Sequence, residues 1–95
     1  MADVKLVVYG TEGDENTRRT REHLKQLSVP YDFVDIDKDQ KAADNVKRWN
    51  HGKRKTPVVQ FTVGEEVYRI AAPDNAALDQ ELQVNGLVPN KTGAA

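Results

Sequence analysis

The residues best suited to chemistry lie in two short segments of opposite charge. Residues 12–15 contain three carboxylates and residues 47–55 contain five cations. These side chains are Glu12, Asp14 and Glu15 in the first segment, and Lys47, Arg48, Lys53, Arg54 and Lys55 in the second. The chain has no cysteine. Because the thiolate is both the nucleophile of disulfide exchange and the ligand of soft metals, both kinds of chemistry are excluded.

The acidic segment is better explained by a helix start than by a metal site. Its oxygen atoms, with that of Asn16, are ligands that Ca²⁺ prefers, but no bidentate glutamate follows at the spacing of an EF-hand loop. The two histidines, His23 and His51, are 28 positions apart and suggest no zinc site. No metal or cofactor is therefore predicted. A carboxylate before a helix accepts a hydrogen bond from the first turn, so Asp14 is predicted to be an N-cap.

The basic segment is interpreted first as a solvated loop, which charge runs usually are. A nucleic-acid site would need aromatic side chains among the cations, and the only tryptophan, Trp49, is expected in the core. The net charge of −1 gives no general attraction to nucleic acid or to a membrane. No stretch has the length of a membrane span or the character of a secretory leader. We therefore expect a cytoplasmic monomer that binds neither.

The chain has 95 residues, which suffice for one domain. Seven predicted strands and helices position the side chains described above. Apolar runs predict strands at 5–9, 31–36, 58–63 and 67–71. Helical spacing predicts a first helix over 17–27, a second that Asp37 or Asp39 caps and that ends at 50–52, and a third that begins near Asp74 or Asn75 and ends at 85–86. The β-α-β-α-β-β-α order predicts an α/β fold, a four-stranded mixed sheet with helices on both faces. Residues 1–89 form this domain and residues 90–95 a flexible tail. Thr17 and Thr20 interrupt the apolar stripe of the first helix, so its first turn is expected to face solvent.

Three segments give this pattern a resemblance to the glutaredoxin family of the thioredoxin fold. They are Tyr9-Gly10-Thr11, Lys55-Thr56-Pro57-Val58-Val59 and Ile70-Ala71-Ala72-Pro73-Asp74-Asn75. The resemblance covers roughly residues 4–82. Within the family, residues 50–57 look most like the mycoredoxin-type proteins of actinobacteria.

The resemblance implies a ligand groove and a lost active site. The family's Cys-x-x-Cys motif falls on positions 14 and 17, which Asp14 and Thr17 occupy, so no catalytic residue remains. The Thr56–Pro57 bond would be cis, and the backbone of Thr56 would meet a thiol peptide. The family holds the γ-glutamyl end of glutathione at a Gly-Gly-x-Asp segment, where this chain has alanines in place of the glycines. The ligand-binding residues implied are Thr11, Lys53, Arg54, Thr56, Pro57, Asp74 and Asn75.

Two functions follow from these expectations. The first is a redox-inactive scaffold or binding module, natural or engineered from a glutathione- or mycothiol-type disulfide oxidoreductase, with glutathione or a thiol peptide as its ligand. The second is an enzyme that activates the thiol of glutathione through Tyr9 or Thr11, as the related glutathione transferases do. Those transferases carry a second, helical domain that this sequence does not contain.

Overall fold

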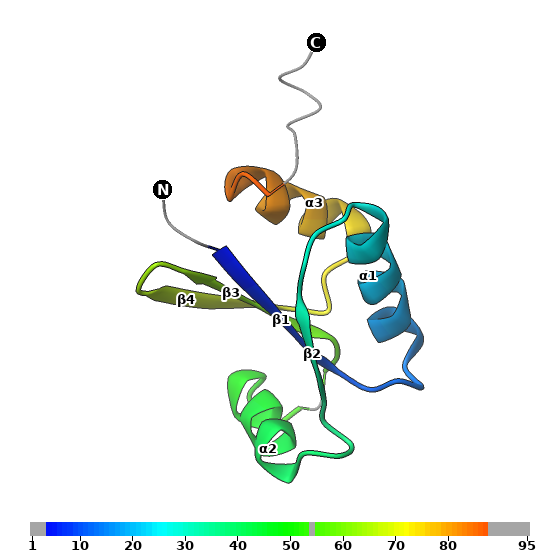
Figure 1. Cartoon of the computed structure of the whole chain (residues 1–95). Helices are drawn as coiled ribbons and strands as arrows, with labels where there is room; N and C mark the ends of the chain where they lie inside the picture. The colour runs from blue at the N-terminus through cyan, green and yellow to red at the C-terminus, as the bar shows by residue number, and fades with distance from the viewer. Residues whose placement is uncertain (1–3, 54, 88–95) are drawn as a thin grey trace.

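The computed structural model describes residues 4–53 and 55–87, which form seven elements in the predicted order (Figure 1). They are β1 (Val4–Gly10), α1 (Glu15–Gln26), β2 (Asp32–Asp35), α2 (Gln40–Trp49), β3 (Val58–Val63), β4 (Glu66–Ala71) and α3 (Asn75–Val84). The predicted tail at 90–95 lies outside the described residues.

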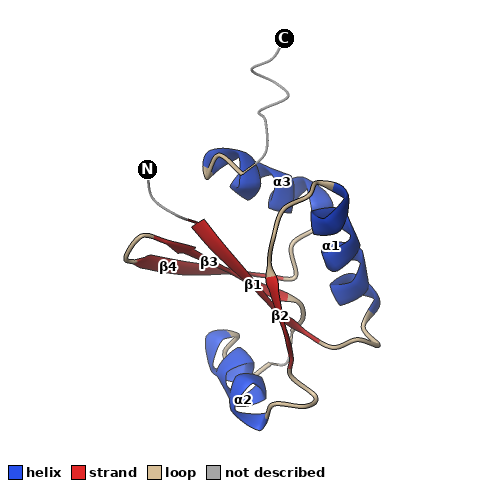
Figure 2. Ribbon diagram, viewed as in Figure 1, coloured by secondary structure: helices blue, strands red, loops and turns tan. Residues whose placement is uncertain are grey.

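The strands form one mixed sheet in the order β2-β1-β3-β4. β1 runs parallel to β2 and antiparallel to β3, and β3 and β4 form an antiparallel hairpin. Figure 2 shows α1 and α3 on one face of this sheet and α2 on the other. The predicted four-stranded mixed sheet with helices on both faces is therefore confirmed.

Alternation along the strands builds a separate apolar cluster on each face. The cluster under α1 and α3 consists of Leu6, Val8, Leu24, Val29, Val59, Phe61, Leu78 and Leu82. The cluster under α2 consists of Ile36, Ala42, Ala43, Val46 and Val58. Val58 and Val59 are neighbours in β3 that point to opposite faces, and each is almost completely buried. Both sides of the central strands are thus covered.

Each helix begins at an aspartate. The carboxylates of Asp14, Asp39 and Asp74 accept hydrogen bonds from the third residue beyond, at 3.0, 3.0 and 2.8 Å. This is the N-cap arrangement, which satisfies one backbone N–H that the first turn cannot pair internally. The predicted cap at Asp14 is confirmed.

The prediction that the first turn of α1 faces solvent holds for Glu15, Asn16 and Arg18, which are exposed, and is wrong for Thr17. Thr17 and Thr20 are both 0% exposed. Gly10 explains the close approach, since a side chain there would place its Cβ only 2.6 Å from Cγ2 of Thr17. The missing side chain lets α1 settle onto the end of β1, and a threonine methyl can then pack where a larger apolar residue would not fit.

Trp49 is also less buried than predicted, because it is the last residue of α2 and lies at the margin of the apolar cluster. Its ring is half-buried and meets the ring of Tyr9 edge-on at 5.1 Å between centroids. The guanidinium of Arg69 lies 3.9 Å from the centre of the Trp49 ring. A cation from β4 thus covers the indole where core side chains do not.

Polar contacts also connect α3 to its neighbours. His23 of α1 and Asp79 of α3 lie 2.6 Å apart, and Tyr68 of β4 donates a hydrogen bond to Glu81 of α3 at 2.9 Å. Across the described part of the chain, no helix has both the length and the apolar character that a membrane crossing requires.

Candidate functional site at the start of the first helix

The site is built on the turn that joins β1 to α1. The chain leaves β1 at Gly10, and the backbone N–H of Asp14 donates to the carbonyl of Thr11 at 3.2 Å. Asp14 keeps an extended backbone, with φ −83° and ψ 125°, and α1 starts at the next residue. Its carboxylate is thereby directed back across the first helical turn.

One carboxylate oxygen of Asp14 is hydrogen-bonded to Thr17, and these two residues occupy the positions of the family's two cysteines. Oδ2 of Asp14 accepts from the backbone N–H of Thr17 at 3.0 Å and from the hydroxyl of Thr17 at 2.8 Å. The same oxygen accepts from the hydroxyl of Thr56, 42 residues further along the chain, at 3.1 Å. Three of the residues singled out from the sequence therefore meet at one atom.

The loop before β3 contributes Thr56 and Pro57. The peptide bond between them is cis, and Pro57 is buried. The carbonyl of Pro57 accepts from the backbone N–H of Ala72 at 2.6 Å, so this loop is tied to the segment that leads into α3. Within residues 4–53 and 55–87, no hydrogen bond is made by the backbone N–H or carbonyl of Thr56. Neither group has a partner among the described residues, so both can pair with an extended ligand.

The start of α3 lies beyond Ala72. Asp74 is exposed, and its carboxylate is engaged as the helix N-cap by the N–H of Ala77. Asn75 is the first helical residue, and its side-chain oxygen is buried without a partner among the described residues. Ala72 has φ 46°, in the left-handed region that favours glycine. The backbone conformation expected of a glycine is therefore kept although the residue has changed.

Of the two predicted basic anchors, the structure describes only Lys53, which borders a different hollow. Lys53 lines a hollow of about 380 Å³ beside Trp49, and neither Asp14 nor Thr56 is part of its lining. The hollow borders Val58 and Ala71, which adjoin Pro57 and Ala72 in the chain. Arg54, the other predicted anchor, lies outside the described residues.

Arg69 belongs to this hollow and was missed in the sequence analysis. A signal for it was present, because the predicted hairpin pairs positions of β3 and β4 across the sheet. Gln60 is paired with Arg69 and Val58 with Ala71, and period-two alternation places these four residues on one face. Working out that register would have placed Arg69 on the face covered by α2, beside the basic segment.

Tyr9 and Thr11, the candidates for activating the thiol of glutathione, lie in different surroundings. The ring of Tyr9 packs with the cluster under α2, against Trp49. Thr11 is half-buried in the turn, where its carbonyl is bonded to Asp14. The structure thus brings together Asp14, Thr17 and Thr56, with Thr11 beside them, and leaves Tyr9 on the other side of the sheet.

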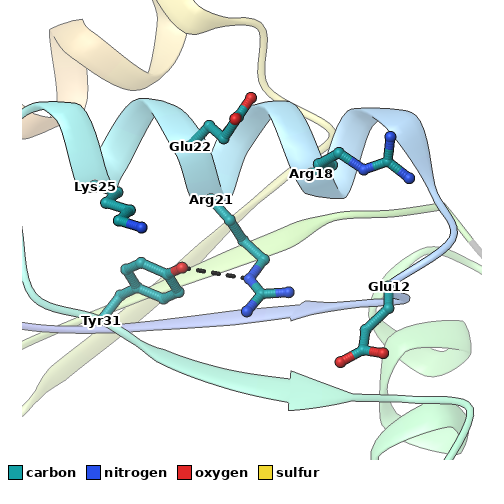
Figure 3. Close-up of a pocket in the computed structure, with 6 residues that line it drawn as sticks. All are labelled: Glu12, Arg18, Arg21, Glu22, Lys25 and Tyr31. Atoms are coloured by element: carbon teal, nitrogen blue, oxygen red, sulfur yellow. Dashed lines mark hydrogen bonds between the residues drawn. The ribbon is translucent and has the colours of Figure 1, made fainter.

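A second hollow, of about 260 Å³, lies along α1 and is shown in Figure 3. It is lined by Glu12, Arg18, Arg21, Glu22, Lys25 and Tyr31. Nε of Arg21 donates to the hydroxyl of Tyr31 at 3.3 Å, and its guanidinium lies 3.9 Å from the centre of the Phe33 ring. Arg21 thus packs as part of the fold, and the lining mixes both signs of charge.

The chemistry of the site is that of a fixed polar surface. Oxygen atoms of a carboxylate and two hydroxyls replace the sulfur atoms of a dithiol, and no mixed disulfide can form on them. In the described part of the chain, no group of three or more His, Asp or Glu side chains could hold a metal ion. The arrangement can orient and hold a ligand without exchanging electrons with it.

Comparison with known proteins places this geometry in a family. The sequence model of the glutaredoxin family matches residues 6–67, about two thirds of the chain. No curated protein sequence matches it significantly.

Solved structures of low sequence identity share the fold. The glutaredoxin of Archaeoglobus fulgidus has a TM-score of 0.58 and 21% identity, over 81% of this chain and 84% of its own. The glutaredoxin-like NrdH-redoxin of Escherichia coli has a TM-score of 0.58 and 15% identity, over 79% and 92%. A wheat glutaredoxin has a TM-score of 0.60 and 17% identity, over 87% and 76%. With its mixed sheet in the order β2-β1-β3-β4 and its match to the family model over residues 6–67, this cysteine-free chain belongs to the glutaredoxin family.

Proposed function

We propose that this protein is a redox-inactive binding module that holds a thiol peptide, with glutathione as the simplest ligand, beside Thr56 and Pro57. The observation that carries the proposal is the backbone of Thr56, which is unpaired among residues 4–53 and 55–87 and lies next to the fixed carboxylate of Asp14. An extended peptide can pair with such a backbone as an added strand does. Binding is reversible, because no cysteine is present to capture the ligand covalently.

The remaining ligand-binding residues expected from the family resemblance would bind the two ends of the peptide. The N-terminus of α3 at Asp74 and Asn75 presents backbone amides, which favour a carboxylate such as that of a γ-glutamyl group. Lys53, with Arg54 beside it in the sequence, would attract the carboxylate at the opposite end of the peptide. Thr11 and Pro57 would form the walls between these ends.

Two finer points belong to the same proposal. Residues 50–57 have the spacing of mycoredoxin-type proteins, and we infer descent from such an oxidoreductase. We also place the protein in the cytoplasm as a monomer, since reduced glutathione is kept there. Among the residues that the structure describes, no contact favours the transferase-like alternative, because Tyr9 packs under α2.

A titration of ¹⁵N-labelled protein with reduced glutathione and with S-methylglutathione tests the proposal. Both ligands should shift the amide resonances of Thr56, Ala72 and Asn75 in the millimolar range. The two should bind alike, because no thiol chemistry takes part. Shifts confined to other surfaces, or no shift at all, would refute the groove.

Two charge reversals sharpen this test. Lys53→Glu should weaken glutathione binding by about three- to tenfold if this lysine attracts a ligand carboxylate. Lys41→Glu is the matched control, since Lys41 is an exposed lysine of α2 that does not line the hollow beside Trp49. Equal weakening by both variants would mean that only the net charge of the protein matters.

A further inference from the structure

The hollow beside Trp49 has a concentration of positive charge, of which the proposed peptide groove uses only Lys53. Its lining consists of Trp49, Asn50, His51, Lys53, Lys55, Val58, Arg69 and Ala71. Three of these residues are permanent cations at neutral pH, and none carries a carboxylate. The chain as a whole has a net charge of −1, so the charge at this hollow is local.

These cations are not neutralised within the described part of the chain. The ion pairs found there are Lys5 with Asp32 and His23 with Asp79, on other surfaces. Lys53 and Lys55 are exposed side chains without a carboxylate partner among residues 4–53 and 55–87. Like charges gathered in a concave surface raise the local concentration of anions.

Arg69 is held in a fixed orientation at the hollow. Its Nε donates to the side-chain oxygen of Gln60 at 2.9 Å, and its Cζ lies over the Trp49 ring, 3.9 Å from the ring centre. The two terminal nitrogens have no hydrogen-bond partner among the described residues. They form a fork of the kind that binds two oxygens of one anion.

The loop that carries the two lysines is held by Asn50. The carbonyl of Asn50 accepts from the backbone N–H of Lys53 at 3.2 Å, and its side-chain amide donates to the carbonyl of Lys55 at 3.2 Å. His51 takes a left-handed backbone with φ 57°, and Gly52 bonds back to the carbonyl of Lys47. Both lysines are thus anchored at the backbone, and less entropy is lost when a ligand binds.

We propose that this hollow is a binding site for a dianionic phosphate group, carried by a small phosphate ester. A phosphate monoester has a charge near −2 at neutral pH and three acceptor oxygens, which match the fork of Arg69 and the ammonium groups of Lys53 and Lys55. A single carboxylate would leave two of the three cations unpaired. The volume of about 380 Å³ lies within the range of small-molecule sites, with room for the organic part of an ester.

The site differs from the proposed peptide groove in its ligand and, apart from Lys53, in its residues. Arg69, Lys55 and Trp49 take no part in that groove, and the fixed turn of Asp14 and Thr56 does not line the hollow. Either proposal can therefore fail without the other.

Trp49 makes the test direct, because it is the only tryptophan and lines the hollow. Glycerol phosphate and inorganic phosphate, titrated at constant ionic strength, should each change its emission with saturation. Both should shift the amides of Lys53, Lys55 and Arg69. Tighter binding of glycerol phosphate identifies an ester as the ligand, and equal binding identifies the phosphate group alone. A response that never saturates, or one that acetate reproduces at the same concentration, overturns the proposal.

Matched variants separate this site from general charge effects. Lys55→Gln and Arg69→Gln should each weaken phosphate binding by about three- to tenfold, measured from amide shifts because Arg69 itself touches the indole. Lys41→Gln removes the same charge from an exposed position of α2 outside the hollow and should change binding less than twofold. If the three variants behave alike while their spectra show folded protein, the hollow is not a site. Phosphate binding without any glutathione shift at Thr56 would leave this inference standing and refute the peptide groove alone.

Discussion

At the scale of single residues, Asp14 and Thr17 occupy the positions of a dithiol and interact through oxygen. Their side chains meet at 2.8 Å, and Thr56 adds a third hydroxyl contact to the same carboxylate oxygen. A hydrogen bond to a charged acceptor is stronger than one between neutral groups. Asp14 therefore serves both as a helix cap and as a tie between two distant segments.

The tie should be measurable as a coupling energy. Asp14→Ala should lower the free energy of unfolding by about 1–2 kcal/mol, because it removes the cap and the contact with Thr56. Thr56→Val removes only that hydroxyl. In a double-mutant cycle by urea denaturation, the two changes should couple by about 0.5–1.5 kcal/mol.

Asp39 provides the control for this cycle. Its carboxylate caps α2 through Ala42 at 3.0 Å and no other hydrogen bond to it is found among the described residues. Asp39→Ala should therefore cost about 1 kcal/mol and show no coupling with Thr56→Val. Additive effects of Asp14→Ala and Thr56→Val would mean that the contact between Asp14 and Thr56 contributes nothing.

Reintroducing the thiols tests the alignment of these positions. Asp14→Cys combined with Thr17→Cys should give a pair that closes to a disulfide under mild oxidation, because the two side chains already touch across the first turn. The helix amides should favour a thiolate at position 14, while Glu12 and Glu15 oppose it. We expect a weaker catalyst than an ordinary glutaredoxin, measured as reduction of a glutathionylated substrate.

The single variants serve as references for that experiment. Asp14→Cys alone should form a mixed disulfide with glutathione, whereas Thr17→Cys should react slowly because Thr17 is buried. A folded double variant that never closes its disulfide would show that positions 14 and 17 are wrongly aligned with the family motif.

At the scale of elements, Ala71 at the end of β4 and Ala72 directly after it lie where the family has two glycines. Ala72 nevertheless keeps a left-handed backbone of the kind that favours glycine. Ala72→Gly should raise the free energy of unfolding by about 0.5–1 kcal/mol, since an L-residue at φ 46° costs more than the extra freedom of glycine in the unfolded chain. Ala71→Gly, one residue earlier in β4, should lower it by about 0.5–1 kcal/mol. Urea denaturation measures the free energy of unfolding of both variants. If Ala72→Gly lowers it as much as Ala71→Gly does, Ala72 does not have a left-handed backbone.

The contact between β4 and α3 should make stability depend on pH. Burial raises the pKa of the Tyr68 hydroxyl above 10.0. The hydrogen bond that Asn85 donates to this hydroxyl lowers the pKa, whereas the hydrogen bond to Glu81 and the negative charge of Glu81 both raise it. Between its unfolded and folded pKa values, Tyr68 holds a proton in the folded state that the unfolded chain has lost. Stability from this group is therefore complete below pH 10 and is lost as the pH rises further.

Tyr68→Phe isolates that contribution from the other groups that titrate in base. The variant keeps the ring stacked on Phe61 but lacks the hydroxyl, so its stability should fall less steeply between about pH 9 and about pH 11. Parallel slopes for the two proteins would mean that the Tyr68 hydroxyl is neither buried nor bonded to Glu81 in solution.

The elements were predictable from sequence to a greater degree than the contacts between them. Apolar runs and capping aspartates located all seven elements, because strand alternation and N-caps are local properties. The burial of Thr17 was not predicted, since it depends on the missing side chain of Gly10 in another element. The hollow at Arg69 was missed for a similar reason, because it requires the register of β4 against β3 together with the end of α2. The contact of Asp14 with Thr56 spans 42 residues, and only the folded chain reveals it.

At the scale of the whole molecule, the family fold is kept and the family chemistry is absent. The protein should give no glutathione-dependent reduction of a mixed disulfide, because no side chain can form the covalent intermediate. The double variant with Asp14→Cys and Thr17→Cys is the positive control on the same scaffold. Turnover that persists in the unchanged protein after removal of host glutaredoxins would contradict this conclusion.

The shared oxygen of Asp14 has a consequence for how the domain responds to its surroundings. A dithiol exists in two covalent forms, and a turn that contains one changes shape with the ratio of oxidised to reduced thiols around it. Asp14 and Thr17 have a single covalent form, and the hydrogen bond to Thr56 is made in that form at any such ratio. A cell under oxidative stress and one at rest would therefore present the same surface here, and a ligand that meets it would be held with the same affinity in both.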